Sequence, residues 1–493
     1  MTRLEIRNPR TGAVVGSVPV ATPAEVRTAA EDARKAFVDW SALSHAGRRP
    51  FLKKFKRVVV ANADHIADVV CSETGKDRVD AYTSDIMPAL SVMDYYARKS
   101  GELLKPVSGG WWPYPMVKRW TEYHPRGVVG AITPWNVPFF LTMLPVFTAV
   151  AAGNGVVAKP SEITPLSGQL CGELAAEAGL PKGLIRVVHG AGETGQALIA
   201  APVDIVWFTG STANGRAVAV AAAERLIPVV LELGGNDAMV VLEDADLRAA
   251  AQCAVWAATY NAGQVCMSVE RVYVPESIYE PFLAEIDAAM ENVAAGTGDN
   301  RDVGAIIDPR LLDVLDRQLA DAVAKGAEIR WGGSRVEGTE GTFFAPSVLT
   351  NVDHSMDLMQ GETFGPVLPV MAVPDEHAAL QFANAGSFGL HSSVWSADKR
   401  RAAKWASKIE SGTMAVNDHL INPFIPDLPF GGIMDSGYGR ELGPEGIREF
   451  CYIKSITSPR LMPTTRLLGG LRWMPRRLGV RYWRAMAKAL FRW

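Results

Sequence analysis

The chain has 493 residues, 48% of them hydrophobic, and a mean hydropathy of +0.06, which is typical of a globular protein with two or three domains. Residues 458–493 contain nine Arg or Lys and no Asp or Glu, so the rest of the chain holds 41 basic and 53 acidic side chains, a net charge of −12. An acidic body of this kind excludes a nucleic-acid enzyme, whose basic surface normally lies on the folded domain.

The five cysteines form no CxxC or Cys/His ligand pattern, so the sequence predicts neither a disulfide framework nor a metal site. They are Cys71, Cys171, Cys253, Cys266 and Cys451. The first residues, Met1 to Glu5, lack the apolar core of a signal peptide. Because reduced thiols fit the cytoplasm, we expect a cytoplasmic protein.

Helical and strand patterns alternate from Thr22 onward. Thr22, Pro23 and Glu25 have the spacing of an N-cap, a first-turn proline and a capping-box glutamate, which predicts a long helix through the thirties. Two series of short β-rich runs follow, one on each side of Glu232, and both are typical of a parallel α/β sheet. The expected strands are 127–132, 155–158, 185–188 and 205–208, then 238–242, 271–274 and 367–371, with a helix at 278–293. The sequence therefore predicts an α/β fold with two α/β domains that meet near Glu232.

Residues 131–158 contain no charged side chain, a run long enough to resemble a membrane span. Three prolines and two asparagines interrupt it, which disfavours one continuous helix. We therefore predict a turn, a buried helix and a buried strand.

Two turns between a strand and a helix are candidates for a nucleotide site. Gly210 to Gly215 follows one expected strand, so its backbone N–H groups can face a phosphate at a helix N-terminus. Lys159 to Glu162 follows another and offers an ammonium and a carboxylate to ribose hydroxyls. Taken alone, the first segment is more often a plain glycine-rich turn, and the second has an alternative reading as a solvated turn.

Cys266 and Glu232 together suggest a thiol nucleophile and a separate base. A thiolate can attack a carbonyl and hold the product as a thioester, and a carboxylate can activate the water that releases it. Asn136 lies between Pro134 and Pro138, a rigid setting for an amide that donates to an oxyanion. Taken alone, Cys266 is better explained as a buried structural thiol, and Asn136 as a solvated turn residue.

Seven motifs stand in the order and spacing of one family. They are 134–138, 159–162, 208–215, 232–235, 261–266, 362–366, and 429–432 with 436–441. On these motifs the chain resembles the aldehyde dehydrogenase superfamily over about residues 8–457. The resemblance implies a Rossmann-like cofactor domain (1–106 and 126–234), an α/β catalytic domain (235–446) and a small β oligomerisation element (107–125 and 447–457), hence a homodimer or homotetramer. The basic amphipathic tail, 458–493, departs from the family.

The resemblance also implies a chemistry. Cys266 attacks the aldehyde, the Asn136 amide and the Cys266 N–H hold the oxyanion, and hydride passes to a nicotinamide. Glu232 then activates the water that hydrolyses the thioester, which argues against the coenzyme A acylating branch. The implied cofactor contacts are Trp135, Lys159, Ser161, Glu162, Gly210, Ser211, Gly215, Gly234, Glu362 and Phe364. NAD is expected over NADP, because the Glu162 carboxylate would repel a 2′-phosphate.

The substrate is expected to be an apolar aliphatic or aromatic aldehyde. The loop 417–428 contains no Arg or Lys that would bind an acidic semialdehyde. The expected tunnel residues are Trp256, Tyr260, Met267, Phe424 and Ile425. Similarity to bacterial succinate-semialdehyde dehydrogenase-like proteins keeps that activity as an alternative, and a non-catalytic structural scaffold or a cofactor-free thiol esterase are others.

The tail predicts an amphipathic helix. If residues 479–493 are helical, Arg481, Arg484, Lys488 and Arg492 fall on one face and apolar residues on the rest. Such a basic helix with tryptophans can lie on an anionic membrane. It can equally pack on the body or on a partner subunit near the tunnel mouth. We therefore expect either peripheral membrane contact or subunit contact.

Overall fold

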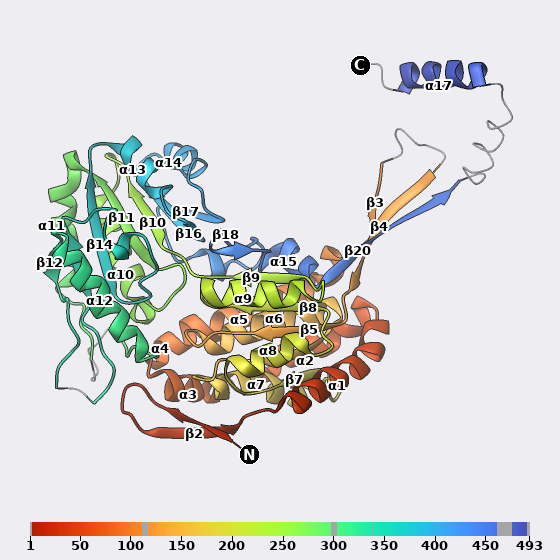
Figure 1. Ribbon diagram of the computed structural model, residues 1–493, viewed down its shortest axis with the longest axis horizontal. Coiled ribbons are helices and arrows are strands. Elements are labelled where there is room, and N and C mark those ends of the chain that lie inside the picture. The colour runs from red at the N-terminus through yellow and green to blue at the C-terminus, as the bar shows by residue number, and fades with distance from the viewer. Residues whose placement is uncertain (1, 111–116, 297–302, 339, 461–475, 491–493) are drawn as a thin grey trace.

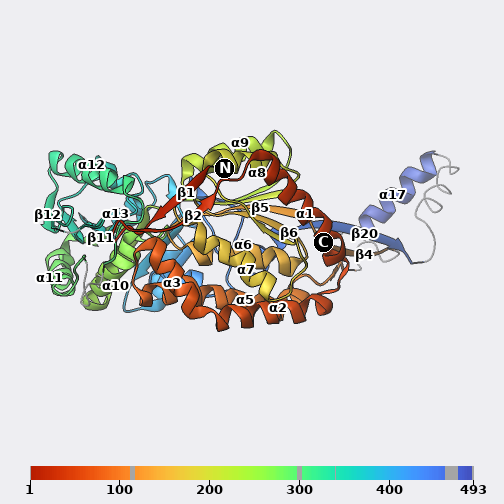
Figure 2. The same ribbon diagram turned by 90° about the horizontal axis from the view of Figure 1, so that it is seen from below.

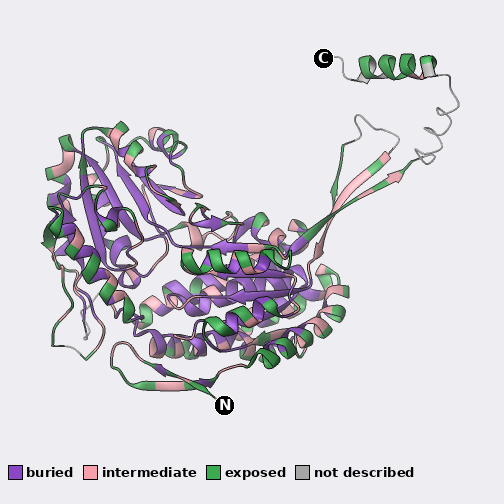
Figure 3. Cartoon of the chain, viewed as in Figure 1, coloured by how far each residue is buried: buried purple, intermediate pink, exposed green. Residues whose placement is uncertain are grey.

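The computed structural model describes residues 2–110, 117–296, 303–338, 340–460 and 476–490. Figure 1 shows two α/β bodies side by side, a narrow β-arm that leaves the larger body, and a helix, α17 (Arg476–Leu490), beyond the end of the arm. Figure 3 shows that the strands of both bodies are buried, whereas the arm is of intermediate burial to exposed and α17 is largely exposed.

The larger body is built on a six-stranded sheet of order β19-β9-β8-β5-β6-β7. Its strands are β5 (Val128–Ile132), β6 (Gly155–Lys159), β7 (Ile185–Val187), β8 (Ile205–Thr209), β9 (Val229–Glu232) and β19 (Gly437–Tyr438). All run parallel except β19, which pairs antiparallel with β9. Both sides of a parallel sheet must be covered, and this explains why these strands are almost continuously apolar.

Helices cover the two faces of this sheet, as Figure 2 shows. One face carries α1 (Pro23–Ala42), α8 (Gly192–Ala200) and α9 (Thr212–Ala223). The other carries α2 (His45–Ala61), α5 (Met87–Leu103), α6 (Pro138–Ala152) and α7 (Pro165–Glu177). Alternate strand residues serve the two cores: Val128 packs in the first and Val129 in the second.

The smaller body is built on a seven-stranded sheet of order β12-β13-β14-β11-β10-β16-β17, in which only the β12 edge is antiparallel. The strands are β10 (Asp237–Val241), β11 (Val269–Pro275), β12 (Glu328–Trp331), β13 (Ser347–Thr350), β14 (Val367–Val373), β16 (His391–Trp395) and β17 (Thr413–Val416). Helices α10 (Leu247–Thr259) and α11 (Tyr279–Met290) cover one face, and α12 (Arg310–Ala324), α13 (Glu376–Ala383) and α14 (Lys399–Ala406) cover the other.

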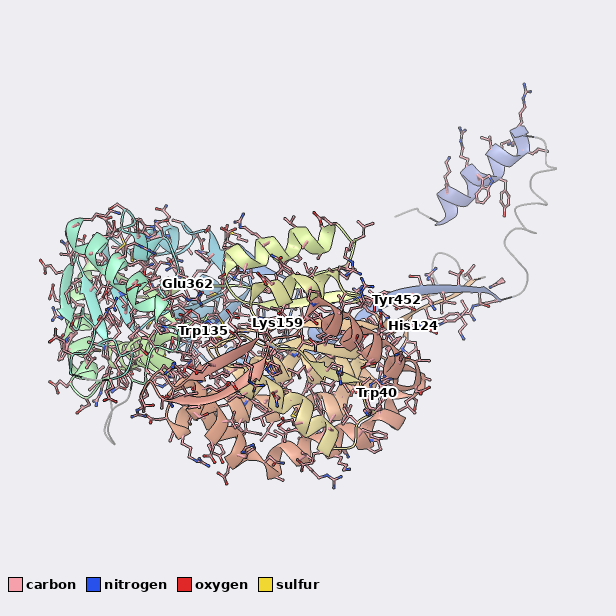
Figure 4. All side chains as sticks on the ribbon, turned by 60° about the horizontal axis from the view of Figure 1, so that its bottom comes forward. Trp40, His124, Trp135, Lys159, Glu362 and Tyr452 are labelled. Atoms are coloured by element: carbon pink, nitrogen blue, oxygen red, sulfur yellow. The ribbon has the colours of Figure 1, made fainter. Side chains whose placement is uncertain are left out.

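The arm is a three-stranded antiparallel sheet of order β20-β4-β3. Strands β4 (Val117–Pro125) and β20 (Cys451–Pro459) pair along their whole length, and β3 (Val107–Ser108) adds a short edge. At the base of the arm, the paired rings of His124 and Tyr452 stack with centroids 5.4 Å apart (Figure 4). Residues 111–116 of the expected oligomerisation element lie outside the described residues.

Shorter elements complete the fold. They are β1 (Arg3–Arg7), β2 (Val14–Pro19), α3 (Ala63–Thr74), α4 (Arg78–Asp80), the π-helix η1 (Ala81–Ile86), the 3-10 turns η2 (Tyr260–Gly263), η3 (Glu276–Ile278), η4 (Asp357–Met359) and η5 (Asn422–Phe424), β15 (Phe388–Gly389), β18 (Ile433–Met434) and α15 (Gly443–Glu449).

The expected elements are confirmed to within a few residues at their ends. The Thr22 hydroxyl accepts from the Glu25 N–H at 3.3 Å, and the Glu25 carboxylate accepts from the Thr22 N–H at 2.8 Å, so the capping box is formed. The uncharged run 131–158 is the end of β5, a turn, the buried helix α6 and β6. Across the described residues, every helix is too short or too polar to cross a bilayer.

Candidate active site

Cys266 lies in a rigid loop between α10 and β11, where the two bodies meet. Asn261 and Ala262 adopt left-handed backbone conformations, with φ of 52° and 57°. The Gln264 side chain ties this loop down, since its amide oxygen accepts from the Ile307 N–H at 2.7 Å and its NH2 donates to the Asn261 carbonyl at 2.9 Å. The strained turn therefore holds the half-buried thiol in one place.

Asn136 is bound to the same loop. Its side-chain NH2 donates to the backbone carbonyl of Gln264 at 3.0 Å. The backbone carbonyl of Asn136 accepts from the side-chain NH2 of Asn261 at 3.1 Å. An amide NH2 carries two hydrogens, so one remains for a ligand beside Cys266. The Cys266 loop and the Asn136 amide are thus positioned as a unit.

Glu232 ends β9, and its side chain is buried, with neither carboxylate oxygen hydrogen-bonded within the described structure. Burial, and next the charge of Glu441, raise the pKa of Glu232 well above its ordinary value. A Cβ on Gly431 would lie 2.7 Å from the Glu232 carboxylate, so this glycine makes room for the Glu232 side chain. A carboxyl group with such a pKa is suited to take a proton near neutral pH.

Glu441 is a second buried carboxyl group at the site, to which the sequence had given no role. Burial raises its pKa to about 8. It follows β19, and the antiparallel pairing of β19 with β9 brings it to Glu232. The signal in the sequence was its place at the end of the motif 436–441.

Three adjoining cavities meet at these residues. The first, the central cavity, is lined by Cys266, Glu232 and Asn136 together with Trp135, Gly210, Ser211, Gly234, Glu362 and Phe364. The second, the turn cavity, shares Trp135, Gly210 and Ser211 with it and adds Lys159, Ser161 and Glu162. The third, the apolar cavity, shares Cys266, Glu232 and Asn136 with the central cavity. The three cavities thus adjoin one another in a series that runs from Lys159 to Cys266 and beyond.

Nine of the ten expected cofactor residues line these cavities. The tenth, Gly215, lies in α9, where a Cβ would collide with the Leu233 side chain, so it allows close packing of α9 on β9. Figure 4 shows Trp135, Lys159 and Glu362 in the middle of the molecule, where the two bodies meet.

The central cavity has a fixed acidic wall. The Glu362 carboxylate accepts from the Gly235 N–H at 3.1 Å, and burial raises its pKa to about 8. A Cβ on Gly234 would collide with the Glu362 carboxylate. The buried Glu270, missed in the sequence, accepts from the N–H groups of Thr363 and Phe364 at 2.9 and 2.8 Å and so fixes this loop.

The central cavity and the turn cavity together fit a dinucleotide. Ser211 caps α9, so the positive end of a helix lines the turn cavity, where a phosphate is favoured. Lys159 lies 3.5 Å from Glu162 at one end, and Trp135 and Phe364 meet edge to face, 5.5 Å apart, at the other. Within the described residues no group of His, Cys, Asp or Glu side chains is arranged to hold a metal ion.

The apolar cavity continues beyond Cys266. Three expected tunnel residues, Tyr260, Met267 and Phe424, line it. The loop 417–428 contributes Leu420 and Pro423 to the wall as well, whereas the sequence missed Pro88, Val137, Phe140, Leu141, Leu390 and Phe430. Every residue of this wall is described, and none of them is Arg, Lys or His. The cavity therefore offers an anionic ligand no cation.

The other two expected tunnel residues lie elsewhere. Trp256 is 48% exposed and lines a surface hollow that shares Tyr260 and Phe424 with the apolar cavity. Trp256 is therefore placed at the mouth of the tunnel rather than beside the nucleophile. Ile425 lines neither the hollow nor any of the three cavities.

His419 fastens the loop 417–428 to the nucleophile loop. Burial lowers its pKa well below the ordinary value, so the ring is neutral. One ring nitrogen lies 3.1 Å from the carbonyl of Met267, beside Cys266, and the other lies 2.8 Å from the Ser393 hydroxyl. The carbonyl can only accept, so the first nitrogen carries the proton. A histidine among apolar residues gave no such signal in the sequence.

Known proteins resemble the whole body of the chain. A family model described as the aldehyde dehydrogenase family matches residues 1–456. A 4,4'-diapolycopene aldehyde oxidase of Methylomonas sp is 39% identical over 466 residues, 94% of this chain and 87% of that protein. A protein of Mycobacterium tuberculosis, named for succinate-semialdehyde dehydrogenase activity with NADP(+), is 36% identical over 454 residues, 92% of this chain and 88% of its own length.

Solved structures share the architecture. The aldehyde dehydrogenase of Mycobacterium tuberculosis complexed with NAD+ superposes with a TM-score of 0.88 at 35% identity and covers 93% of this chain and 95% of that one. The NAD-dependent aldehyde dehydrogenase of Sinorhizobium meliloti gives a TM-score of 0.90 at 33% identity, with 94% and 92% covered.

Proposed function

The chain belongs to the aldehyde dehydrogenase family, and we propose that it oxidises an apolar, uncharged aldehyde to the carboxylic acid, with NAD as the preferred acceptor. The observation that carries the proposal is the apolar cavity, which leads to Cys266 and has no cationic side chain in its wall.

Cys266 is the proposed nucleophile. Burial, and next the charge of Asp237, raise the pKa of its thiol well above the ordinary value, so a base must take the proton as the sulfur attacks. Glu232 lines the same cavities and is the proposed base. The new carbon–sulfur bond leaves an oxyanion, to which the free hydrogen of the Asn136 amide and the Cys266 N–H donate.

The cofactor, when bound, supplies the hydride acceptor. Glu362 would hold its nicotinamide ribose, the N-terminus of α9 its phosphates, and Lys159 and Glu162 its adenosine ribose. The carboxylate of Glu162 supports NAD over NADP, since it attracts ribose hydroxyls and repels a 2′-phosphate. Relatives carry names with either cofactor.

Glu232 also serves the second half of the reaction. Its carboxylate takes a proton from a water molecule, whose oxygen attacks the thioester carbon. The tetrahedral adduct then expels the Cys266 thiolate and releases the carboxylic acid. Because the same group acts in both steps, it must return its first proton before the water attacks, and the buried Glu441 beside it makes the pair sensitive to pH.

Succinic semialdehyde is the second candidate, favoured by the names of the mycobacterial relatives. It carries a carboxylate, whereas 4,4'-diapolycopene aldehyde, named in the other relative, does not. The wall of the apolar cavity offers that carboxylate no cationic partner and adds the negative charge of Glu232 and Glu441 when they are ionised. This charge arrangement favours the uncharged aldehyde.

We also propose that the arm joins subunits into at least a homodimer. Its strands project from the body (Figure 1), and Ile453 on β20 is 64% exposed. An exposed apolar strand edge of this kind is usually covered by another chain.

The test is NADH formation followed by absorbance, with octanal, benzaldehyde and succinic semialdehyde, each with NAD and with NADP. We expect kcat/KM for octanal or benzaldehyde to exceed that for succinic semialdehyde at least tenfold, and NAD to exceed NADP. The reverse order of aldehydes would assign the succinic semialdehyde activity. No signal with any aldehyde, and no effect of Cys266→Ser, would favour a scaffold without catalysis. Ester hydrolysis that needs no NAD would favour the thiol esterase.

A further inference from the structure

The C-terminal helix α17 lies outside the part of the chain that matches the aldehyde dehydrogenase family. The family match ends at residue 456, and α17 begins at Arg476. Its sequence belongs to the stretch 458–493, which has nine basic and no acidic residues, whereas the rest of the chain has a net charge of −12. The helix therefore belongs to a separate segment, whose net charge is opposite to that of the rest of the chain.

The helix is amphipathic. Arg477, Arg481, Arg484 and Lys488 recur at intervals of four, three and four residues and so share one face. Leu478, Tyr482 and Trp483 fall on the other side. The expected helix is thus confirmed over 476–490, and Arg492 of the predicted basic face lies outside the described residues.

The apolar side of α17 is uncovered in this chain. Leu478 is 51% exposed, Tyr482 41% and Trp483 47%. Figures 1 and 4 show the helix clear of both bodies, and Figure 4 shows its drawn side chains in open space. Exposed leucine, tyrosine and tryptophan side chains on the side of a helix away from its basic face indicate a surface that binds a partner or a membrane.

The charge indicates what the surface binds. Tryptophan and tyrosine favour the headgroup level of a bilayer, where their rings are buried and their polar ends stay wet. Each Lys or Arg near an anionic leaflet adds electrostatic attraction to the surface. With no acidic residue to oppose them, the four cations of the basic face suit a negatively charged lipid surface.

We propose that α17 docks by its apolar face on an anionic lipid bilayer and holds the enzyme where apolar aldehydes partition. The docking rests on α17 alone. Its purpose rests on the proposed function, because only an apolar substrate is concentrated in the lipid.

Vesicle co-sedimentation of the full-length protein tests the docking. The probes are vesicles of phosphatidylcholine with about one third phosphatidylglycerol, and vesicles of phosphatidylcholine alone. We expect at least tenfold stronger binding to the anionic vesicles, reduced by salt. Leu478→Ser with Trp483→Ser, and separately Arg477→Glu with Arg481→Glu, should each weaken this binding at least tenfold.

Matched controls come from exposed helices of the body. Val38→Ser on α1 is 61% exposed and tests a lost surface apolar side chain, and Lys53→Glu with Arg57→Glu on α2 repeats the four-residue charge reversal. Both should bind vesicles as the parent protein does. Equal binding by the parent and by the Leu478/Trp483 variant would overturn the proposal. So would a change of oligomeric state in that variant without vesicle binding by the parent, which would assign α17 to a subunit contact.

A second readout separates docking from catalysis. NADH formation from benzaldehyde in solution should be equal in the parent and in all tail variants, whereas oxidation of a long-chain aldehyde held in anionic vesicles should fall at least threefold in the tail variants. Vesicle binding without any NADH formation would contradict the proposed function and leave the docking intact.

Discussion

The Lys76 ammonium donates a hydrogen bond of 3.0 Å to the backbone carbonyl oxygen of Asn136, from a position that is closed to solvent. The same ammonium forms a 3.0 Å ion pair with Asp85, on the π-helix η1. The other Asp85 oxygen accepts from the Phe139 N–H at 3.0 Å, at the start of α6. Lys76 and Asp85 therefore clamp both ends of the segment that carries the Asn136 amide.

Replacement of Lys76 by Met should therefore damage both stability and chemistry. Loss of one partner leaves the Asp85 charge buried and unpaired, which costs about 3–5 kcal/mol of the free energy of unfolding. In the Lys76→Met protein that folds, displacement of the Asn136 amide should lower kcat more than it changes KM. Urea unfolding and steady-state kinetics measure the two effects. Lys99→Met, which removes an exposed ion pair with Glu102, should cost less than about 1 kcal/mol; an equal loss in both variants would contradict the clamp.

Cys266→Ala should abolish NADH formation, with kcat lowered about 10³-fold or more, because no other group at the site can form the thioester. The change removes one half-buried sulfur and should leave the thermal midpoint of unfolding within a few degrees. Cys71→Ala on α3, also half-buried, is the control and should retain activity. Substantial turnover by Cys266→Ala would remove the thiol from the mechanism.

Glu232→Gln should slow both half-reactions, and thioester hydrolysis more than thiol attack, because water is a much weaker acid than a thiol and depends more on the base. The amide cannot take a proton from water, so thioester hydrolysis should slow by about 10²–10⁴-fold. Rapid-quench analysis after mixing with NAD and aldehyde should detect acyl-enzyme that persists, and mass spectrometry should find the acyl group on Cys266. Fast multiple turnover with no acyl-enzyme would show that another group activates the water.

The rate should rise with pH over a range that lies well above the ordinary pKa of a glutamate side chain. Catalysis needs the ionised form of Glu232, and burial together with Glu441 raises the pKa of that carboxyl group. Glu441→Gln removes the negative neighbour, which lowers the pKa of Glu232, so the rise of kcat should shift to lower pH. The measurement is kcat at saturating aldehyde and NAD between pH 6 and 10. Glu445→Gln, an exposed carboxylate on α15, should leave the profile unmoved, and a shift to higher pH in Glu441→Gln would contradict the coupling.

Gly234→Ala should weaken cofactor binding. The new methyl group collides with the Glu362 carboxylate and displaces it from its bond to the Gly235 N–H. We expect KM for NAD to rise about tenfold, equivalent to about 1.4 kcal/mol, with a smaller change in KM for the aldehyde. Gly110→Ala, where the added carbon meets nothing within 4 Å, should behave as the parent.

Local sequence determined the elements and the membership of the family. Apolar runs of four to seven residues predicted the parallel strands, because a strand covered on both faces has no polar side. Thr22, Pro23 and Glu25 predicted a helix start that depends only on neighbouring backbone groups. Short motifs in fixed order identified Cys266, Glu232 and Asn136, and the expected α/β fold and aldehyde dehydrogenase family are confirmed.

Tertiary structure decided which residues surround that chemistry. Glu441 reaches Glu232 through the pairing of two strands that lie some two hundred residues apart, and Lys76 reaches Asn136 across 60 residues. The wall of the apolar cavity comes from α6, the loop 417–428 and several other segments. Trp256 lies at the tunnel mouth because it stands near the end of α10, which reaches the surface hollow there. The pKa of a carboxyl group and the charge of the side chains that line a cavity depend on burial and on neighbours brought together by folding. No local pattern in the sequence therefore encodes them.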